Sequence, residues 1–258
     1  MGNLKPLYLR EVRSFVSTPI AYLVGVIFLL VTGVFFTMIL LDYSRYSFEV
    51  MRSGGQYRVE GLTVAESILR PALSTMSFLL LFMLPMFTMK SFSEERKSGT
   101  IEILFTYPLR DTEIVLGKFL AAFTVFFMIA GMTLFYQVEI AYFRAIPIKE
   151  ILTGYFGLAL MAGFFISVGI FVSSLTENQV VAGAWTFGLN IVFWMVGWIA
   201  GDSQSVPSQI SKYLSVFEHF ENFANGMVDT RDVVYFVSFT ALFLFLTLRV
   251  LESRRYGS

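Results

Sequence analysis

Residues 93–118 read SEERKSGTIEILFTYPLRDTEIVLGK, a charged and turn-rich insert between two long apolar runs. Gly99 favours a break in the chain, and Thr100 is a good N-cap for a helix that begins at Ile101. Glu102 would then lie in the first turn, where the helix dipole favours an acid. Pro108 ends or bends this helix, because the residue before a proline is pushed out of helical geometry. The segment therefore predicts a helix of about two turns.

The predicted helix is amphipathic and carries its charges at one end. Ile101, Leu104 and Phe105 fall on one face at helical spacing. The charged residues that precede it are Glu94, Glu95, Arg96 and Lys97. An apolar face with a charged rim has the chemistry of a small protein interface, which favours a docking element over the range 90–113. The alternative is a solvated loop that only orients the chain.

The composition is that of an integral membrane protein. The chain has 258 residues, of which 56% are hydrophobic, with 29 Phe and a mean hydropathy of +0.69. Lys plus Arg and Asp plus Glu balance at 19 each, so no basic field favours a nucleic-acid partner. There is no Cys, which excludes disulfides, thiolate metal sites and Cys nucleophiles.

Six apolar runs are long enough, or nearly so, to cross a hydrocarbon layer about 30 Å thick, which takes about 20 residues. An even number of spans puts both termini on one side. Pro85 lies inside the second run and predicts a kink or a local widening of that helix. The runs are Ile20–Leu41, Ala72–Met89, 114–136, Ile151–Val172, Val180–Ala200 and Val233–Leu251.

The chain outside these runs is too short for a soluble domain, so we expect a single transmembrane domain over 1–258. Residues 1–19 carry apolar side chains at helical spacing between charged ones, which predicts an amphipathic helix on the membrane surface. Residues 42–71 and 201–232 are the longest gaps. The second gap interleaves apolar and polar residues and predicts one or two short external or re-entrant helices in the outer leaflet.

Three separated motifs resemble ATP-binding-cassette (ABC) transporter permeases of the type-2 export class. The first is Glu94–Leu104 followed by Pro108 and Gly117-Lys118. Ser173–Ala182 is the second, and Phe220–Gly226 with Thr230–Tyr235 is the third. The last two are most similar to the gliding-motility-associated branch of these permeases. The motifs occur in the family's order, and the resemblance covers nearly the whole chain.

The resemblance implies a complex with several partners. It implies a second permease subunit, forming a homodimer or heterodimer through the first and fifth spans, and cytoplasmic ABC ATPase subunits. The loop around Glu94–Leu104 would be the coupling helix that enters a cleft on the ATPase, and Glu177 would lie in a second contact. A periplasmic accessory protein and membrane lipids are further expected partners. The expected location is the bacterial inner membrane, with both termini cytoplasmic, in agreement with the slight excess of Lys and Arg on that side.

The chain has no nucleotide-binding motif of its own. A phosphate-binding loop needs Gly-x-x-x-x-Gly-Lys-Ser/Thr after a strand, whereas Gly117-Lys118 is followed by Phe119 at the start of an apolar helix. We therefore expect ATP and Mg to be bound and hydrolysed by the partner ATPase, with no cofactor and no catalytic residue in this chain. His219 is the one histidine and has no second ligand at metal-binding spacing, so we expect no metal site.

Two polar residues in the spans are candidates for a translocation path. Asn190 is near the middle of the fifth span, where it either bonds to another helix or contacts substrate. Glu139 lies at the end of the third span, where its charge either belongs to the boundary between membrane and water or marks an exit site for substrate.

Two functions other than that of a permease are possible. A stand-alone secondary transporter predicts charges and broken helices at mid-membrane, and an intramembrane enzyme needs facing catalytic pairs.

Overall fold

The computed structural model describes residues 4–53, 64–100, 110–143, 148–199 and 206–255. Every regular element in these ranges is a helix. The elements are α1 (Leu4–Ser17), α2 (Pro19–Arg52), η1 (Ala65–Leu69), α3 (Arg70–Thr88), α4 (Ser93–Lys97), α6 (Asp111–Phe143), α7 (Ile148–Leu175), α8 (Gln179–Ile199), α9 (Val206–Leu214), α10 (Val216–Ala224) and α11 (Thr230–Arg255). The predicted all-α class is confirmed.

Six helical stretches in the described chain are long and apolar enough to cross a membrane, as predicted. They are Pro19–Arg52, Ala65–Lys97, Asp111–Val138, Ile148–Leu175, Gln179–Trp198 and Thr230–Arg254. Most begin earlier or end later than the apolar runs do. The largest difference is in α2, whose 34 residues extend about 51 Å at 1.5 Å per residue. The predicted run ends at Leu41, whereas the helix continues to Arg52 and is longer than a hydrocarbon layer of about 30 Å requires.

Helix α7 is the centre of the bundle. It packs against α3, α6, α8, α10 and α11. In the apolar part of α7, 83% of the residues are buried, compared with 28% in α2 and α8 and 22% in α11. Glycines allow the close contacts, since a Cβ on Gly157 would lie 2.4 Å from the Cβ of Phe223, and one on Gly169 would lie 1.9 Å from Oγ1 of Thr88. Small residues in this span thus serve packing within one chain.

Phenylalanine supplies much of the interface between α7, α8 and α11. Phe164 of α7 is fully buried, and its ring centroid lies 5.3 Å from that of Phe193 and 5.8 Å from that of Phe239. Both contacts are edge-to-face, a geometry that aromatic rings favour. Many of the 29 Phe residues therefore belong to the core and not only to surfaces that face lipid.

The local widening predicted at Pro85 is not found there, and the kink that was its alternative stays a prediction. Helix α3 runs through Pro85, and the π-helical turn is η1, which leads directly into α3. The hydrogen bonds of a π turn span five residues, one more than in an α-helix. The turn therefore changes the direction of the side chains that follow it. Ile68 and Leu69 of this turn are buried in the bundle.

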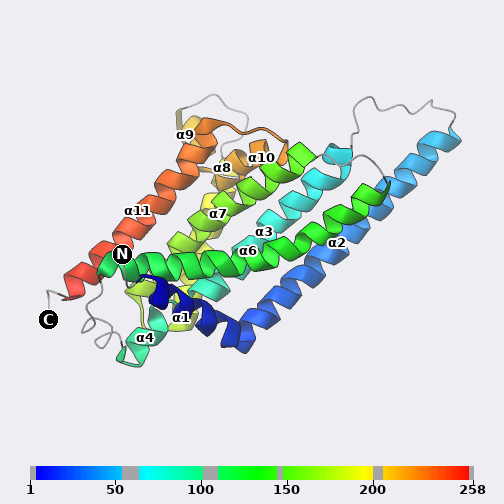
Figure 1. The fold of residues 1–258 in the computed structure, drawn as a ribbon. Helices are drawn as coiled ribbons and strands as arrows, with labels where there is room; N and C mark the ends of the chain where they lie inside the picture. The colour runs from blue at the N-terminus through cyan, green and yellow to red at the C-terminus, as the bar shows by residue number, and fades with distance from the viewer. Residues whose placement is uncertain (1–3, 54–63, 101–109, 144–147, 200–205, 256–258) are drawn as a thin grey trace.

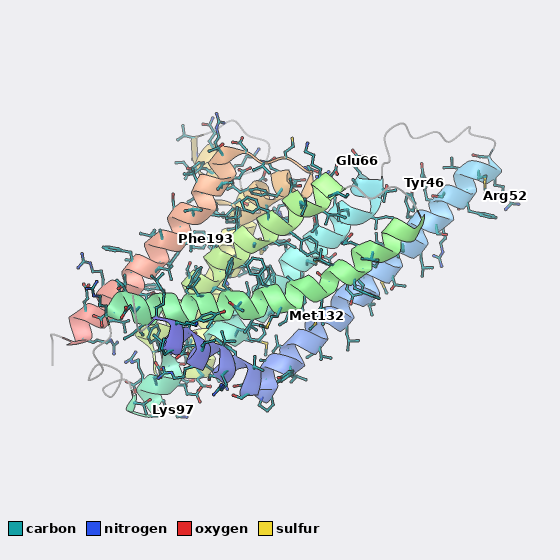
Figure 2. All side chains as sticks on the ribbon, viewed as in Figure 1. Tyr46, Arg52, Glu66, Lys97, Met132 and Phe193 are labelled. Atoms are coloured by element: carbon teal, nitrogen blue, oxygen red, sulfur yellow. The ribbon has the colours of Figure 1, made fainter. Side chains whose placement is uncertain are left out.

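The two ends of the bundle differ in structure. Figure 1 shows α1, α4, the start of α6 and the end of α11 at one end, and α9 and α10 at the other. Both ends of the described chain thus lie at the same end of the bundle, as six spans require. Figure 2 shows Lys97 at the α4 end and Arg52 and Glu66 at the opposite end. Two short helices, α9 and α10, lie in the predicted 201–232 segment; their position in the outer leaflet stays a prediction.

Candidate coupling site around α4

Helix α4 is a single turn whose sequence suits its two ends. Glu94 and Glu95 lie in its first turn, and Arg96 and Lys97 lie in its last turn, so each charge matches the helix dipole. Gly99 follows the helix with φ +69°, in the left-handed region that side chains other than glycine rarely adopt. Its amide donates to the Arg96 carbonyl at 3.1 Å. The predicted break at Gly99 is confirmed.

Ser173 of α7 holds the start of α4 from one side. The backbone amides of Phe92 and Ser93 donate to its Oγ at 2.9 and 3.1 Å. The same hydroxyl donates to the carbonyl of Met89 at 3.1 Å. These groups are buried, so their hydrogen bonds replace contacts with water that burial removes. The turn between α3 and α4 is therefore fixed to the central helix.

Arg96 connects α4 to the turn between α7 and α8. Its Nη2 lies 3.0 Å from Oε1 of Glu177, and its Nη1 donates to the carbonyl of Ser174 at 3.1 Å. The Arg96 side chain is 10% exposed, whereas that of Glu177 is 65% exposed. The two predicted coupling segments are thus joined to each other through this ion pair.

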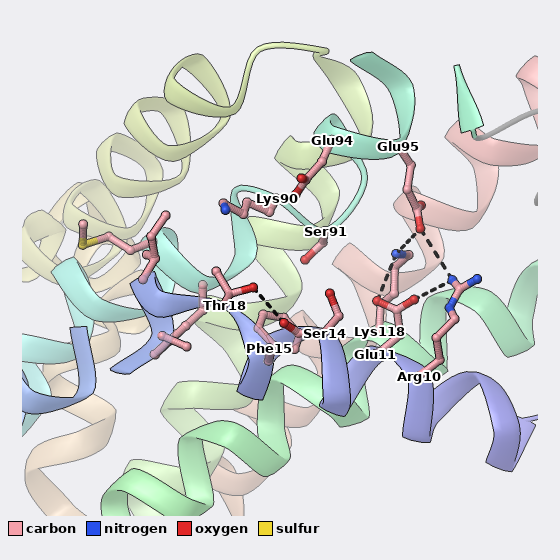
Figure 3. Close-up of a pocket in the computed structure, with 14 residues that line it drawn as sticks. Arg10, Glu11, Ser14, Phe15, Thr18, Lys90, Ser91, Glu94, Glu95 and Lys118 are labelled. Carbon is pink, nitrogen blue, oxygen red and sulfur yellow. Dashed lines mark hydrogen bonds and ion pairs between the residues drawn. The ribbon is translucent and has the colours of Figure 1, made fainter. Parts of the chain in front are cut away.

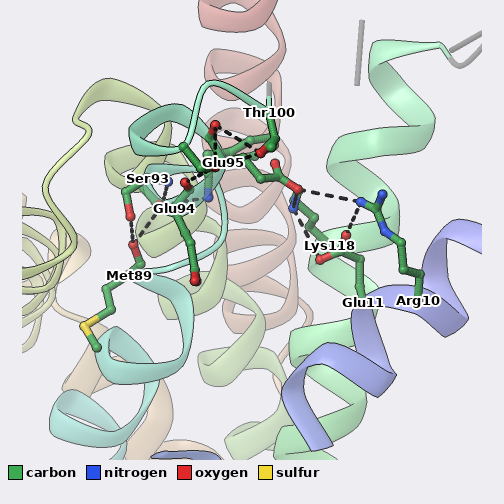
Figure 4. Close-up of polar contacts among 11 residues, drawn as sticks. Arg10, Glu11, Met89, Ser93, Glu94, Glu95, Thr100 and Lys118 are labelled. Atoms are coloured by element: carbon green, nitrogen blue, oxygen red, sulfur yellow. Dashed lines mark hydrogen bonds and ion pairs between the residues drawn. The ribbon is translucent and has the colours of Figure 1, made fainter. Parts of the chain in front are cut away.

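Glu95 connects α4 to α1 and α6 on the other side, through the four-residue ion network drawn in Figure 4. The Nζ of Lys118 lies 2.8 Å from Oε1 of Glu95 and 3.3 Å from Oε2 of Glu11. Arg10 closes the network, because its Nη2 lies 2.7 Å from Oε1 of Glu11 and 3.6 Å from Oε1 of Glu95. Lys118 is only 2% exposed and also lies 5.1 Å from the ring centroid of Phe92.

The charges of this network determine the protonation of Glu11. Burial raises the pKa of its carboxyl group, but the ammonium of Lys118 and the guanidinium of Arg10 outweigh burial, and the pKa is lowered below 4.5. Glu11 is therefore a carboxylate at neutral pH. A buried lysine between two carboxylates is electrically compensated, as a buried charge must be.

The structure places some of the predicted coupling residues on the surface of α4 and the turn after it. Glu94, Lys97, Gly99 and Thr100 are exposed. The Thr100 hydroxyl lies 2.8 Å from the Ser98 hydroxyl and donates to the Glu95 carbonyl at 3.3 Å. The predicted apolar face and its boundaries lie outside the described residues; these are Ile101, Glu102, Leu104, Phe105 and Pro108.

Several residues of this site were not predicted as coupling residues, although Lys118 and Ser173 lie in motifs that resemble the family. Arg10, Glu11, Lys118 and Ser173 all contribute contacts to α4 or to its ion network. One signal was present, since Lys118 is a lone cation in the first two turns of an apolar helix. Its partners come from segments 23 and 107 residues away, which a local pattern cannot reveal.

The two candidate path residues differ in what the structure describes. Asn190 is completely buried in α8, and neither atom of its amide has a hydrogen-bond partner in the described part of the chain. Burying an amide without a partner is unfavourable, so water or a ligand is expected there. The side chain of Glu139 lies outside the described residues.

His219 belongs to a polar cluster at the opposite end of the bundle. Its Nδ1 lies 2.6 Å from Oδ1 of Asp232, its Nε2 lies 2.9 Å from the carbonyl of Tyr213, and its ring stacks on Tyr235 at 4.0 Å. Asn222 donates to the other carboxylate oxygen of Asp232 at 2.9 Å. Within the described ranges no group of three His, Cys, Asp or Glu is arranged to hold a metal. The cluster ties α10 to the start of α11.

Comparison with known proteins identifies the family. A search of curated proteins finds no match. The family model described as "ABC-2 family transporter protein" matches residues 6–254, which is nearly the whole chain. The match includes most of α1, the segment around α4 and the six apolar stretches of the described chain. The chain belongs to the ABC-2 family of transporter proteins and is a multi-pass membrane permease.

Proposed function

We propose that this chain is the permease subunit of an ABC exporter or mechanotransmission complex, and that α4 with the residues after it receives work from a separate ATPase. The observation that carries the proposal is the position of α4. The Arg96–Glu177 ion pair joins it to the α7–α8 turn. The ion pairs of Glu95 with Arg10 and Lys118 join it to α1 and α6. A displacement of α4 would therefore be transmitted to both sides of the bundle.

The exposed residues of α4 are suited to contact a partner. Glu94 and Lys97 have exposed side chains, while Glu95 and Arg96 on the same turn are committed to contacts within the chain. Helix α4 would therefore dock to a partner through Glu94 and Lys97 and be anchored to the bundle through Glu95 and Arg96. Ile101, Leu104 and Phe105, which follow in the sequence, would supply the apolar part of the docking surface.

The proposed composition of the complex is the one that the resemblance to type-2 ABC permeases implies. Two copies of this permease, or this chain and a related one, would form the membrane dimer, and each would receive one ATPase subunit on the side of α4. ATP binding would bring the ATPases together and reorient the two bundles, a rigid-body transition between two states. We further propose the gliding-motility-associated branch, an accessory protein at the α9–α10 end, and the bacterial inner membrane with cytoplasmic termini.

The stand-alone secondary transporter has less support. Such a transporter needs ionisable groups near mid-membrane. In the described part of the chain, the buried ionisable residues Glu11, Lys118, His219 and Asp232 lie in or next to the ends of the spans. Coupling to an ion gradient therefore has no described site in the membrane interior.

The test is permease-stimulated ATP hydrolysis by the cognate ATPase in proteoliposomes. Glu94→Arg and Leu104→Arg alter the proposed docking surface, and each should abolish stimulation while the permease still inserts and remains monodisperse. Lys149→Glu is the control, because this exposed charge lies at the other end of the bundle, at the start of α7. Unchanged stimulation in both docking variants would contradict the proposal. Transport that proceeds without ATP, driven by an ion gradient, would support the alternative.

A further inference from the structure

A half-open hollow of about 330 Å³ lies where α1 crosses the ends of α2 and α3. Figure 3 shows Lys90, Ser91 and Glu94 along one side of it, and along the other side Ser14 and Phe15 of α1 with Thr18, which precedes α2. Its volume lies within the range of about 300 to 1,000 Å³ that small-molecule sites occupy. The ion network of Lys118 forms one wall of this hollow but does not fill it.

The hollow contains polar groups without partners. Ser91 is 7% exposed, and its hydroxyl has no hydrogen-bond partner in the described chain. The same is true of Oε2 of Glu95, whose other oxygen binds Lys118. Among the described side chains, none forms an ion pair with Lys90 or Glu94, which also line the hollow. Buried polar atoms are almost always satisfied, so the Ser91 hydroxyl and Oε2 of Glu95 indicate a ligand that both donates and accepts hydrogen bonds. Lys90 and Glu94, which are less buried, can add charged contacts to it.

An apolar groove between α2 and α3 adjoins the hollow at Met86. The groove has a volume of about 90 Å³ and is lined only by apolar side chains, including Val24 and Phe82. Met86 lines both spaces, and Ala21 of the hollow is one helical turn from Val24 of the groove. Ile27 and Phe82, which line the groove, are about half exposed on the surface of the bundle.

We propose that the hollow and the groove together bind one membrane phospholipid with an amine-bearing headgroup, of the phosphatidylethanolamine type. Lys90 and the Ser91 hydroxyl bind the phosphate. The ammonium of the headgroup donates to the free Oε2 of Glu95 and pairs with Glu94. The acyl chain follows the groove from Met86 towards Val24.

The charges of the hollow select this headgroup. Three cations and three carboxylates line it, so a zwitterion matches its formal charge better than an anionic lipid does. The unpartnered carboxylate oxygen requires an N–H or O–H donor, which the quaternary ammonium of a choline headgroup does not have. Phosphatidylethanolamine should therefore bind more tightly than phosphatidylcholine or phosphatidylglycerol. The site shares Glu94 with the proposed docking surface and Glu95 with the ion network of Lys118. Lipid retention by the permease alone does not involve the ATPase, so the two proposals can fail separately.

The experiment measures lipid retained by the full chain in native mass spectrometry after exchange into detergent containing one of these three lipids. We expect one phosphatidylethanolamine per chain, retained about tenfold better than phosphatidylcholine, because two charge-assisted contacts are gained. Lys90→Gln should reduce the retention of all three lipids. Glu94→Gln should reduce only the preference for the amine. Lys97→Gln is the matched control, since Lys97 is on α4 but does not line the hollow.

Equal retention of the three lipids, or a preference for phosphatidylglycerol, would overturn the proposal. So would a double variant at Lys90 and Glu94 that folds, by circular dichroism, and retains phosphatidylethanolamine as the unaltered chain does. Should that variant fail to fold, the unaltered chain provides a second measurement. A phosphatidylethanolamine with a photoreactive group near its phosphate should crosslink to residues of the hollow, such as Thr18 or Ser91, and crosslinks confined to other surfaces would refute the site.

Discussion

The ammonium of Lys118 lies 2.8 Å from the carboxylate of Glu95 and joins the third span to the turn that follows the second span. The Lys118 side chain is 3% exposed and that of Glu95 is 21% exposed, so this contact is largely shielded from water. Breaking one member of a buried ion network leaves the other charges uncompensated, which is far more costly than losing a surface ion pair. The pair is therefore a structural link between α4 and α6.

Replacing Lys118 should destabilise the permease. Lys118→Met keeps the length of the side chain but removes the buried cation between Glu11 and Glu95 and leaves the more exposed Arg10 to compensate both, so we expect a loss of about 3 kcal/mol. Thermal unfolding of the detergent-solubilised chain measures the effect. Lys97→Met, on the exposed side of α4, is the control and should change stability by less than about 0.5 kcal/mol. Similar melting temperatures for the two variants would show that the network does not stabilise the fold.

The lowered pKa of Glu11 gives the stability a dependence on acid pH. Because folding favours the carboxylate, its contribution is present above the ordinary pKa of 4.5 and is lost as the pH falls through the lower folded-state pKa. The melting temperature of the unaltered chain should therefore decrease as the pH is lowered below about 4.5. Glu11→Gln should be less stable at neutral pH and should show a smaller decrease over the same range. Parallel pH profiles for the two proteins would contradict the assignment.

Gly99→Ala tests the backbone conformation after α4. An alanine at φ +69° costs about 1 to 2 kcal/mol, and no atom lies within 4 Å to add a steric clash. The change should lower thermal stability by that amount and alter the direction in which the following residues leave α4. Gly131→Ala is the matched control, because Gly131 also has open space around it but lies within α6. There alanine should be neutral or stabilising by up to about 1 kcal/mol.

The parts of the structure that the sequence predicts well are those set by local composition. The six spans were predicted from runs of apolar residues. The break at Gly99 was predicted because glycine, unlike other residue types, readily adopts a positive φ. The helix ends were less predictable, because hydropathy reports only the part of a helix that lipid surrounds. Helix α2 continues to Arg52 with polar residues that a hydropathy pattern assigns to a loop.

The candidate site was only partly predictable, for a different physical reason. Glu95 and Arg96 were recognised as part of a charged segment, but their partners depend on how distant helices pack. Lys118 meets Glu11 across 107 residues, and Arg96 meets Glu177 across 81. The π-helical turn η1 was likewise not predicted from the sequence.

The Arg96–Glu177 pair provides a test of the link between α4 and the α7–α8 turn. Glu177→Ala should cost less than about 1 kcal/mol, because the Glu177 side chain is 65% exposed and its charge is screened by water. Arg96→Ala should cost more, because it also removes the hydrogen bond to the Ser174 carbonyl. Both effects are read from thermal unfolding, and ATPase stimulation in proteoliposomes reports whether the link transmits work.

Exchanging the two charges separates the ion pair from general effects of mutation. Arg96→Glu places two acids against each other and should reduce both stability and stimulation. The double variant Arg96→Glu with Glu177→Arg restores an attractive pair but not the bond to Ser174, so it should recover part of each loss. A double variant that is no better than Arg96→Glu alone would mean that the two side chains are not coupled. Recovery of stability without recovery of stimulation would mean that the pair stabilises the fold but does not transmit the motion of α4.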